Sequence, residues 1–220
     1  METSKIMTMK NISFWEKVLK DMPESYRKWF DEEEKYLNNL ITQDSKVLEV
    51  GCGNGRVLLK LLNKTKNLIG IDNEAKAVKD AKENFKSYPE LKFLLADVRS
   101  IPFEDNYFDF VLCIGTFANF YNYKFKALEE MKRVVKNNGF IIISVYSEDA
   151  FEERMKLYKK IKTPIQEIKG TTVFFAGEKE GENASEQFSK QELQEIFKKT
   201  KLKTLEIKKA GIGYICKLKK

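Results

Sequence analysis

The chain has 220 residues with 42% apolar side chains, which indicates one folded domain over residues 1–220, and its +7 net charge rests on 35 lysines but only five arginines. Because no stretch reaches the ~18 apolar residues of a membrane span and residues 1–10 lack the apolar core of a signal peptide, we expect a cytoplasmic protein with no membrane partner. The absence of histidine excludes Ser-His-Asp catalysis and histidine-bound metals, and three widely separated cysteines predict neither a disulfide framework nor a metal site.

The N-terminal part, residues 13–40, has the spacing of two helical stretches. Pro23 separates them, because proline ends or kinks a helix. The second stretch places Tyr26, Trp29 and Phe30 on one face ahead of the acidic run 31–34. This pattern predicts an amphipathic helix that packs on the rest of the domain.

From residue 46 onward, short apolar strands alternate with helical patterns. The last helix of this series carries Leu128 and Met131, and the run Asn137-Asn-Gly139 predicts its end. Strands that are apolar throughout and separated by helices predict an α/β fold with a doubly wound, mainly parallel sheet. The five predicted strands are residues 46–50, 67–72, 91–97, 108–114 and 140–146.

Residues 147–188 interrupt this alternation. They predict a helix over Phe151–Tyr158 and then a hairpin that turns at Lys169-Gly170. Ser189 and Glu192 have the spacing of a capping box, which predicts the start of the last helix. Two further strands, 202–208 and 212–218, predict a closing antiparallel pair.

A glycine-rich loop, Gly51-Cys-Gly53-Asn-Gly55, follows the first strand, and Glu49 stands two residues before it. Ligands of parallel α/β sheets bind beyond the carboxyl ends of the strands, where glycine lets the backbone approach a ligand closely. The nicotinamide fingerprint needs a glycine where Arg56 stands, and a carboxylate at Glu49 would repel a pyrophosphate but suits an ammonium group. A tight turn that binds nothing is the alternative.

The segment Val47–Gly55 resembles motif I of the class I S-adenosylmethionine-dependent methyltransferases. Gly70-Ile-Asp72, Leu95–Val98, Ile101–Ile114 and Leu128–Phe140 follow in the order of that family. The similarity is strong over residues 40–146 and looser over 188–218. It implies a doubly wound, seven-stranded, mainly parallel Rossmann-like sheet with an antiparallel C-terminal strand, helices on both faces and a small lid or insert.

The resemblance implies S-adenosylmethionine as cofactor and S-adenosylhomocysteine as product. Asp72 matches the acid that holds the ribose hydroxyls, Asp97 and Val98 match the pair that reads adenine, and the Ile114 carbonyl matches a partner of the methionine amine. By residue chemistry alone, Asp72 could instead cap a helix and Asp97 could stabilise a turn. The full set of expected cofactor-binding residues is Glu49, Gly51, Gly53, Gly55, Asp72, Asn73, Asp97, Val98 and Ile114.

Methyl transfer from a sulfonium is an in-line displacement, so a catalytic triad is not required. The segment after the fourth strand lacks the Asn/Asp-Pro-Pro-Tyr signature of base-amine methyltransferases and resembles small-molecule N- or O-methyltransferases. Phe117, Phe120 and Tyr121 are acceptor-pocket candidates, and ordinary core packing is their alternative. Tyr26 resembles an aromatic residue of the family's N-terminal lid, here residues 1–40. The insert 147–188 stands where the family builds its acceptor specificity.

Two other functions stay open. An RNA methyltransferase is supported by the positive charge and by nine lysines within residues 198–220, although these alternate with apolar residues as in an edge strand. A non-catalytic module that binds S-adenosylmethionine is the second. A small-molecule acceptor is favoured, no catalytic base is identified, and the oligomeric state is open.

Overall fold

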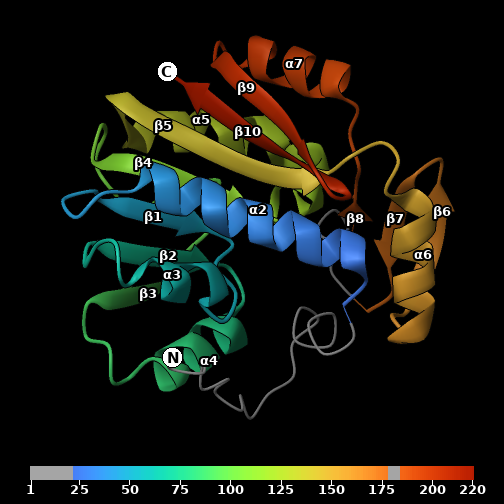
Figure 1. Ribbon diagram of the computed structural model, residues 1–220, viewed down its shortest axis with the longest axis horizontal. Coiled ribbons are helices and arrows are strands. Elements are labelled where there is room, and N and C mark those ends of the chain that lie inside the picture. The colour runs from blue at the N-terminus through green and yellow to red at the C-terminus, as the bar shows by residue number, and fades with distance from the viewer. Residues whose placement is uncertain (1–21, 178–183) are drawn as a thin grey trace.

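The computed structural model describes residues 22–177 and 184–220. Its main sheet has seven strands in the order β3-β2-β1-β4-β5-β10-β9 (Figure 1). The first five strands are parallel, and β10 pairs antiparallel with both β5 and β9. This confirms the predicted fold class. The bounds are β1 Val47–Val50, β2 Leu68–Asp72, β3 Leu91–Leu95, β4 Phe108–Ile114, β5 Val135–Tyr146, β9 Lys203–Ala210 and β10 Gly213–Lys219.

Helices cover both faces of this sheet. In Figure 1, α2 crosses the front of the sheet and α5 lies behind it. No helix within residues 22–177 and 184–220 is long and apolar enough to cross a bilayer. The helices that flank the sheet are α2 Glu24–Leu40, α3 Arg56–Leu61, α4 Ala75–Asn84, α5 Lys124–Val134 and α7 Lys190–Lys199.

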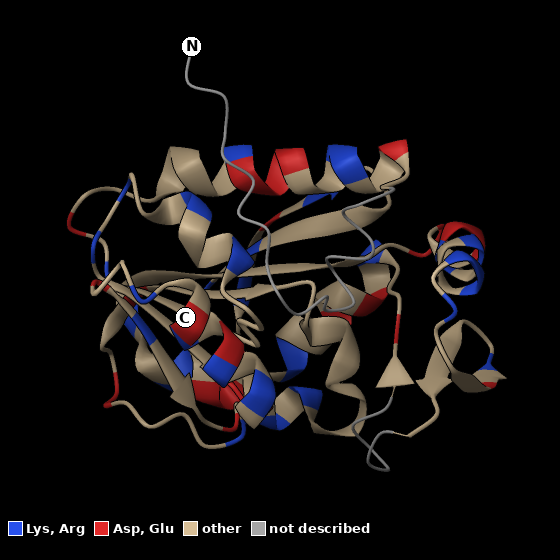
Figure 2. Cartoon of the chain, turned by 90° about the horizontal axis from the view of Figure 1, so that it is seen from below, with Lys and Arg blue, Asp and Glu red and all other residues tan. Residues whose placement is uncertain are grey.

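Helix α2 docks on the last strand pair through glycines. A Cβ atom at Gly213 would overlap the indole of Trp29, and one at Gly211 would overlap the carbonyl oxygen of Ser25. Trp29 is fully buried, and its Nε1–H donates to Ser144 Oγ of β5 at 2.7 Å. The helix therefore lies close against the sheet, and residues of both charges, coloured blue and red, occur along its length (Figure 2).

The predicted helix of residues 24–40 is confirmed, and it continues through the acidic run 31–34. The helical stretch expected before Pro23 lies outside the described residues. The prediction that Asn137–Gly139 ends α5 is wrong, because α5 ends at Val134 and Val135 already has extended φ and ψ angles of −74° and 142°. Gly139 lies within β5, where a Cβ atom would overlap the carbonyl oxygen of Asp109, so close strand packing explains this glycine.

The described part of residues 147–188 contains α6, Phe151–Lys160, and a three-stranded sheet in the order β6-β7-β8. The hairpin between β6, Ile165–Lys169, and β7, Thr172–Phe175, turns at Gly170 as predicted. The sequence gives no signal for β8, which has only the two residues Ala184–Ser185. Both hydrogen bonds of the capping box at Ser189 are present.

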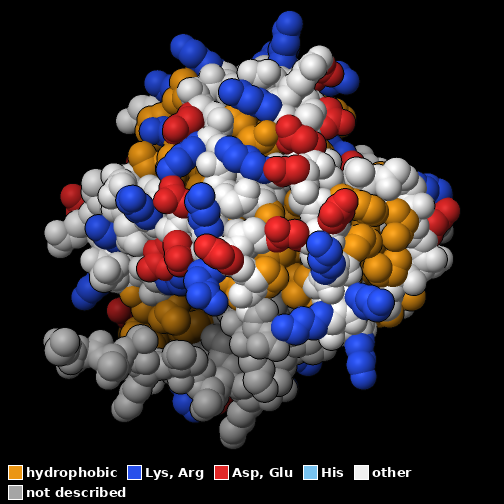
Figure 3. All heavy atoms as spheres, turned by 45° about the vertical axis from the view of Figure 1, so that its right-hand side comes forward, with side chains coloured by type: hydrophobic (Ala, Val, Ile, Leu, Met, Phe, Trp, Pro, Cys, Tyr) orange, Lys and Arg blue, Asp and Glu red, His pale blue; other side chains and the backbone are white. Residues whose placement is uncertain are grey.

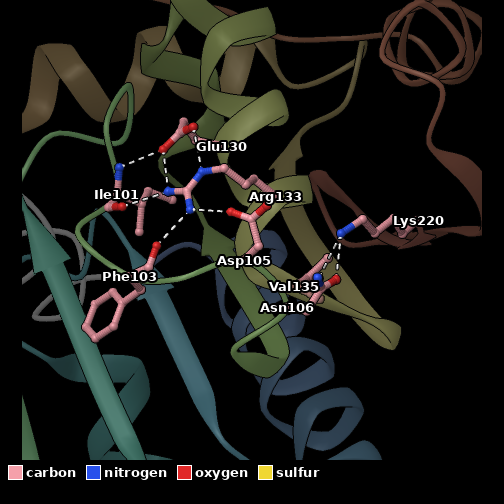
Figure 4. A network of polar contacts seen from close by, with 8 residues as sticks. All are labelled: Ile101, Phe103, Asp105, Asn106, Glu130, Arg133, Val135 and Lys220. Atoms are coloured by element: carbon pink, nitrogen blue, oxygen red, sulfur yellow. Dashed lines mark hydrogen bonds and ion pairs between the residues drawn. The ribbon is translucent and has the colours of Figure 1, made fainter.

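The loop between β3 and β4 is held by one arginine of α5 (Figure 4). The Arg133 guanidinium donates to the carbonyl oxygens of Ile101 and Phe103 at 2.8 and 2.7 Å. It also forms ion pairs with Asp105 and Glu130 at 2.9 and 2.8 Å. Because these bonds satisfy carbonyl groups that the turn leaves unpaired, they fix the path of the chain into β4.

Candidate functional site

The three glycines of the loop after β1 have different roles. All have positive φ angles, 68° at Gly51, 51° at Gly53 and 86° at Gly55. A Cβ atom would overlap the Thr116 side chain at Gly51 and the rings of Phe85 and Phe93 at Gly55, but at Gly53 it would meet no atom within 4 Å. Packing therefore explains two of the glycines, and only Gly53 borders open space that a ligand can fill.

Asp72, at the end of β2, organises this loop. Its Oδ2 accepts the Gly53 N–H at 2.8 Å, and its Oδ1 accepts the Glu74 N–H at 2.9 Å, before α4 begins. The carboxylate thus supports the glycine loop and the turn into α4, but it does not cap the helix, because the N-cap residue of α4 is Glu74 and no side chain makes a capping hydrogen bond there. Each oxygen keeps a lone pair, so the same group can also accept from a ribose diol.

Asp97 follows β3 and is half-buried beside Asp72. The Asp72 carbonyl oxygen accepts the Ala96 N–H at 2.9 Å, which brings the ends of the two strands together. Arg99 donates from its backbone N–H and its Nε to Asp97 at 2.7 and 2.9 Å, and this lowers the pKa of the carboxyl group. The Arg99 guanidinium also lies 5.0 Å from the centre of the Tyr123 ring. Sequence reasoning missed Arg99, although it stands only two residues from the acid.

Beneath the loop, Glu49 is 2% exposed, and its Oε2 has no hydrogen-bond partner among the described residues. Burial raises its pKa well above the ordinary value, and the Arg56 guanidinium opposes this shift. Glu33 of α2 is buried nearby, accepts a hydrogen bond from the Ser144 hydroxyl, and has its pKa raised by burial to about 7. Burial makes ionisation of these carboxyl groups unfavourable, and a positively charged ligand beside them would stabilise the ionised form.

The end of β4 joins the glycine loop through Thr116. Its hydroxyl donates to the Gly51 carbonyl oxygen at 3.1 Å, and it lies 3.5 Å from the carbonyl oxygen of Ile114. Ile114 is buried at the strand end, as is Val98 after β3. Asn73 stands between β2 and α4, next to Asp72. The structure therefore brings the expected donor-site residues to one edge of the sheet, and it adds Thr116 to them.

The expected acceptor aromatics are divided between core and boundary. Phe117 is fully buried, and its ring centre lies 5.7–6.4 Å from those of Phe120, Phe188 and Phe197. Phe120 is 3% exposed. Both rings therefore pack in the core. Tyr121 is half-buried, and its ring meets Phe174 of β7 edge-on at 5.5 Å, so it contacts the insert.

Tyr26 lies at the start of α2 and is fully buried. Its ring centre is 6.1 Å from that of Tyr146, the last residue of β5. Ser25 beside it donates a hydrogen bond to Glu153 of α6. Tyr26 thus stands where the N-terminal helix, the carboxyl end of β5 and the insert meet.

The residues at this edge fit S-adenosylmethionine. The open space at Gly53 admits a ligand against the backbone, and the unpaired oxygen of Glu49 suits an ammonium group. Within residues 22–177 and 184–220, no group of three or more acidic, cysteine or histidine residues is placed to hold a metal ion. The arrangement can bind and orient a reactive ligand, and it offers no histidine for proton transfer.

Comparison with known proteins gives a consistent result. Residues 48–143 match the family described as "Methyltransferase domain". The chain is 34% identical over 146 residues to an uncharacterized protein of Methanocaldococcus jannaschii, MJ1123, a match that covers 64% of this chain and 66% of that protein. It is 32% identical over 131 residues to a demethylmenaquinone methyltransferase of Staphylococcus aureus, covering 57% of this chain and 54% of the relative. The chain thus spans less than two thirds of these relatives.

Among solved structures, the chain is similar to an S-adenosylmethionine-dependent methyltransferase from Clostridium acetobutylicum. The TM-score is 0.66 at 17% identity, and the alignment covers 93% of this chain and 95% of the other. At this identity the likeness concerns the fold, and it extends over the N-terminal and C-terminal parts that the family match leaves out.

Proposed function

Residues 48–143 form a methyltransferase domain of the class I S-adenosylmethionine-dependent family, and on this premise we propose that the chain transfers a methyl group to a nitrogen or oxygen atom of a small molecule. S-adenosylmethionine is the methyl donor of this family. The observation that carries the proposal is the unpaired, buried oxygen of Glu49 beneath the open face of Gly53. A buried polar atom without a partner is costly, so its presence indicates a ligand.

Different residues of the site would bind different parts of the donor. Glu49 and the carbonyl oxygen of Ile114 would hold the methionine ammonium, Asp72 would accept from the ribose, and Asp97 with the Val98 N–H would hold adenine. When bound, the donor supplies an activated methyl group on its sulfonium. The chain then needs to align an acceptor with that methyl group and to exclude water. A general base is needed only if the acceptor arrives protonated.

The contacts of three C-terminal lysines favour a small acceptor over RNA, because these side chains are engaged within the protein. Lys208 and Lys209 form ion pairs with Glu32 and Asp149 at 2.6 and 2.5 Å, and Lys217 lies 4.1 Å from the centre of the Phe140 ring. On the face drawn in Figure 3, acidic and basic side chains are interspersed. An RNA-binding groove would instead need a continuous basic surface that tracks phosphates.

The test has two steps. Calorimetry should show binding of S-adenosylhomocysteine, and absence of binding at millimolar ligand would contradict the proposal. The chain is then incubated with S-adenosylmethionine labelled in its methyl group, together with either a small-molecule extract or total RNA. We expect label in the small-molecule fraction, and Asp72→Ala should reduce it when the donor concentration is limiting. Label in RNA alone would support the alternative acceptor.

A further inference from the structure

A buried arginine stands at the same edge of the sheet, away from the donor residues. Arg154 of α6 is fully buried, although the chain uses lysine seven times as often as arginine. No carboxylate among residues 22–177 and 184–220 lies within ion-pair distance of it, and its described partners are all neutral. A buried cation without a counter-ion is unfavourable, so its place needs an explanation.

The terminal nitrogens of Arg154 hold the insert together. Nη1 donates to Gln187 Oε1 at 2.9 Å, and Nη2 donates to the carbonyl oxygen and the hydroxyl of Ser185 at 2.9 and 3.0 Å. The guanidinium carbon lies 4.5 Å from the centre of the Tyr146 ring at the end of β5. These contacts fix the plane of the guanidinium against the sheet, but none of them neutralises its charge.

Two buried donors in this cluster have no acceptor. Arg154 Nε has no hydrogen-bond partner among the described residues. The Tyr26 hydroxyl lies beside the Tyr146 hydroxyl, towards which it can only accept, and it donates to no described residue; both side chains are fully buried. Burial raises the pKa of Tyr26 and that of Tyr146, so both hydroxyls keep their protons at neutral pH. The cluster therefore combines a positive charge with unused N–H and O–H donors, which suits an anion.

The position of the cluster connects it with methyl transfer. Tyr26 begins α2, Tyr146 ends β5 and Arg154 lies in the insert, so three segments far apart in the sequence meet here (Figure 1). The carboxyl ends of β1–β4, which carry the donor-site residues, lie at the same edge of the sheet. An anion held at this cluster would thus belong to the acceptor rather than to the donor.

We propose that Arg154 Nε and the Tyr26 hydroxyl bind the carboxylate of the methyl acceptor, which is therefore a small carboxylic acid. The inference rests on the proposed function. A planar carboxylate can accept one hydrogen bond on each oxygen, and two unused donors match that number. A phosphate group has more oxygens and more charge than two donors satisfy.

Benzoate is the probe, because it joins a carboxylate to a ring that suits the surrounding tyrosines, and benzamide is its neutral counterpart. The chain is saturated with S-adenosylhomocysteine, and each probe is titrated to tens of millimolar by calorimetry. We expect benzoate to bind and benzamide not to bind. Equal binding of the two, binding of neither, or tighter binding of inorganic phosphate than of benzoate would overturn the inference.

Variants locate the binding. Tyr26→Phe should weaken benzoate binding about tenfold, from loss of one hydrogen bond to a charged group. Arg154→Lys keeps the charge but removes the Nε–H, and should weaken it at least as much. Tyr36→Phe, which removes a hydroxyl from the same helix that bonds Glu206, is the matched control and should leave benzoate affinity unchanged. If Tyr26→Phe binds benzoate normally while its circular dichroism is unchanged, the inference fails.

The two proposals fail in different ways. Loss of S-adenosylhomocysteine binding in the unmodified chain would remove the proposed function. Normal binding of that ligand without discrimination between benzoate and benzamide would remove only the carboxylate site. Because Tyr26→Phe needs no change in α6, it tests the site even if Arg154→Lys does not fold.

Discussion

Two regions of the molecule are built differently. They are the proposed donor half, residues 47–116, and the proposed acceptor half, formed by the start of α2, the end of β5 and residues 147–188. In the donor half, the contacts that shape the site involve backbone groups of the strand-end loops, as where Asp72 accepts the N–H groups of Gly53 and Glu74. In the acceptor half, side chains distant in sequence converge, as where Trp29 bonds Ser144 115 residues away. Backbone geometry tolerates few substitutions, whereas a side-chain cluster can change its specificity one residue at a time.

The largest effect should come from a matched pair of glycine substitutions, one in each half. Gly53 and Gly170 have φ angles of 51° and 59°, and neither would place a Cβ atom within 4 Å of another atom. Valine at either position should cost ~1–2 kcal/mol of folding free energy because of the left-handed backbone. Only Gly53→Val should also reduce S-adenosylhomocysteine affinity, by at least about 100-fold, because its side chain occupies the ligand space.

Thermal unfolding and calorimetry on both variants check this prediction. Similar losses of stability with unequal losses of affinity would support the division into halves. If Gly170→Val also lost donor affinity, the insert would take part in donor binding and the division would be wrong.

The next effect concerns Glu33, which lies between the two halves. Its folded-state pKa of about 7 is above the ordinary value of 4.5, so the fold favours the protonated form. The stabilising contribution is complete below about pH 4.5 and is lost as pH rises through 7, and it amounts to about 3 kcal/mol. Burial is the main cause, and Arg56, Lys60 and the Ser144 hydroxyl oppose it.

Glu33→Gln should remove this dependence, because glutamine keeps the neutral form at every pH. Urea unfolding between pH 5 and 8 measures the free energy of unfolding of both proteins, at about four pH values. As pH rises, we expect the free energy of unfolding of the unmodified chain to fall more steeply than the free energy of unfolding of the variant. Parallel curves would show that Glu33 does not titrate in this range.

Asp72→Ala should weaken donor binding by about 2 kcal/mol, or roughly 30-fold. The loss combines the acceptor for the ribose with the bond that holds Gly53 in place. Asp80→Ala is the control, because Asp80 lies on α4 and pairs with Lys76 at 2.8 Å on the helix surface. Calorimetry with S-adenosylhomocysteine measures both. A folded Asp72→Ala protein with normal affinity would show that this acid serves only the backbone around Gly53 and Glu74 and does not bind the donor.

The same difference between the halves explains which parts of the fold and of the site could be predicted from the sequence. The strands, the glycine loop and the acids Asp72 and Asp97 were predicted because each signal is local, as is the capping box at Ser189. The start of β5 was not, since the close approach of Gly139 to Asp109 depends on strand pairing. A two-residue strand such as β8 carries no periodic pattern at all.

The sequence predicts less about the acceptor half, because its contacts join residues that are far apart in the chain. Phe117 and Phe120 belong to one short segment, but the Phe117 ring packs against Phe188 and Phe197, which come from other parts of the chain. Nothing in the residues around position 154 distinguishes Arg154 from the lysines beside it. Its role depends on Ser185 and Gln187, 31 and 33 residues away, and on the tyrosine at the end of β5.

The smallest effect should come from Arg99, whose side chain reaches from the donor half toward the acceptor half. It donates to Asp97 and lies over the Tyr123 ring, and the side chains of Arg99 and Asp97 are 43% and 36% exposed. An ion pair this exposed contributes between about 0 and 1 kcal/mol. If Asp97 holds the adenine amino group as proposed, Arg99 competes for the same carboxylate, and Arg99→Ala should raise S-adenosylhomocysteine affinity about two- to threefold. S-inosylhomocysteine, which has a carbonyl oxygen in place of that amino group, should gain nothing, and Lys86→Ala, in an exposed pair with Glu83, should change neither affinity. An equal gain for both ligands would mean that Arg99 acts on the conformation of the loop. A loss of S-adenosylhomocysteine affinity would mean that Arg99 orients Asp97 for adenine and therefore belongs to the donor half.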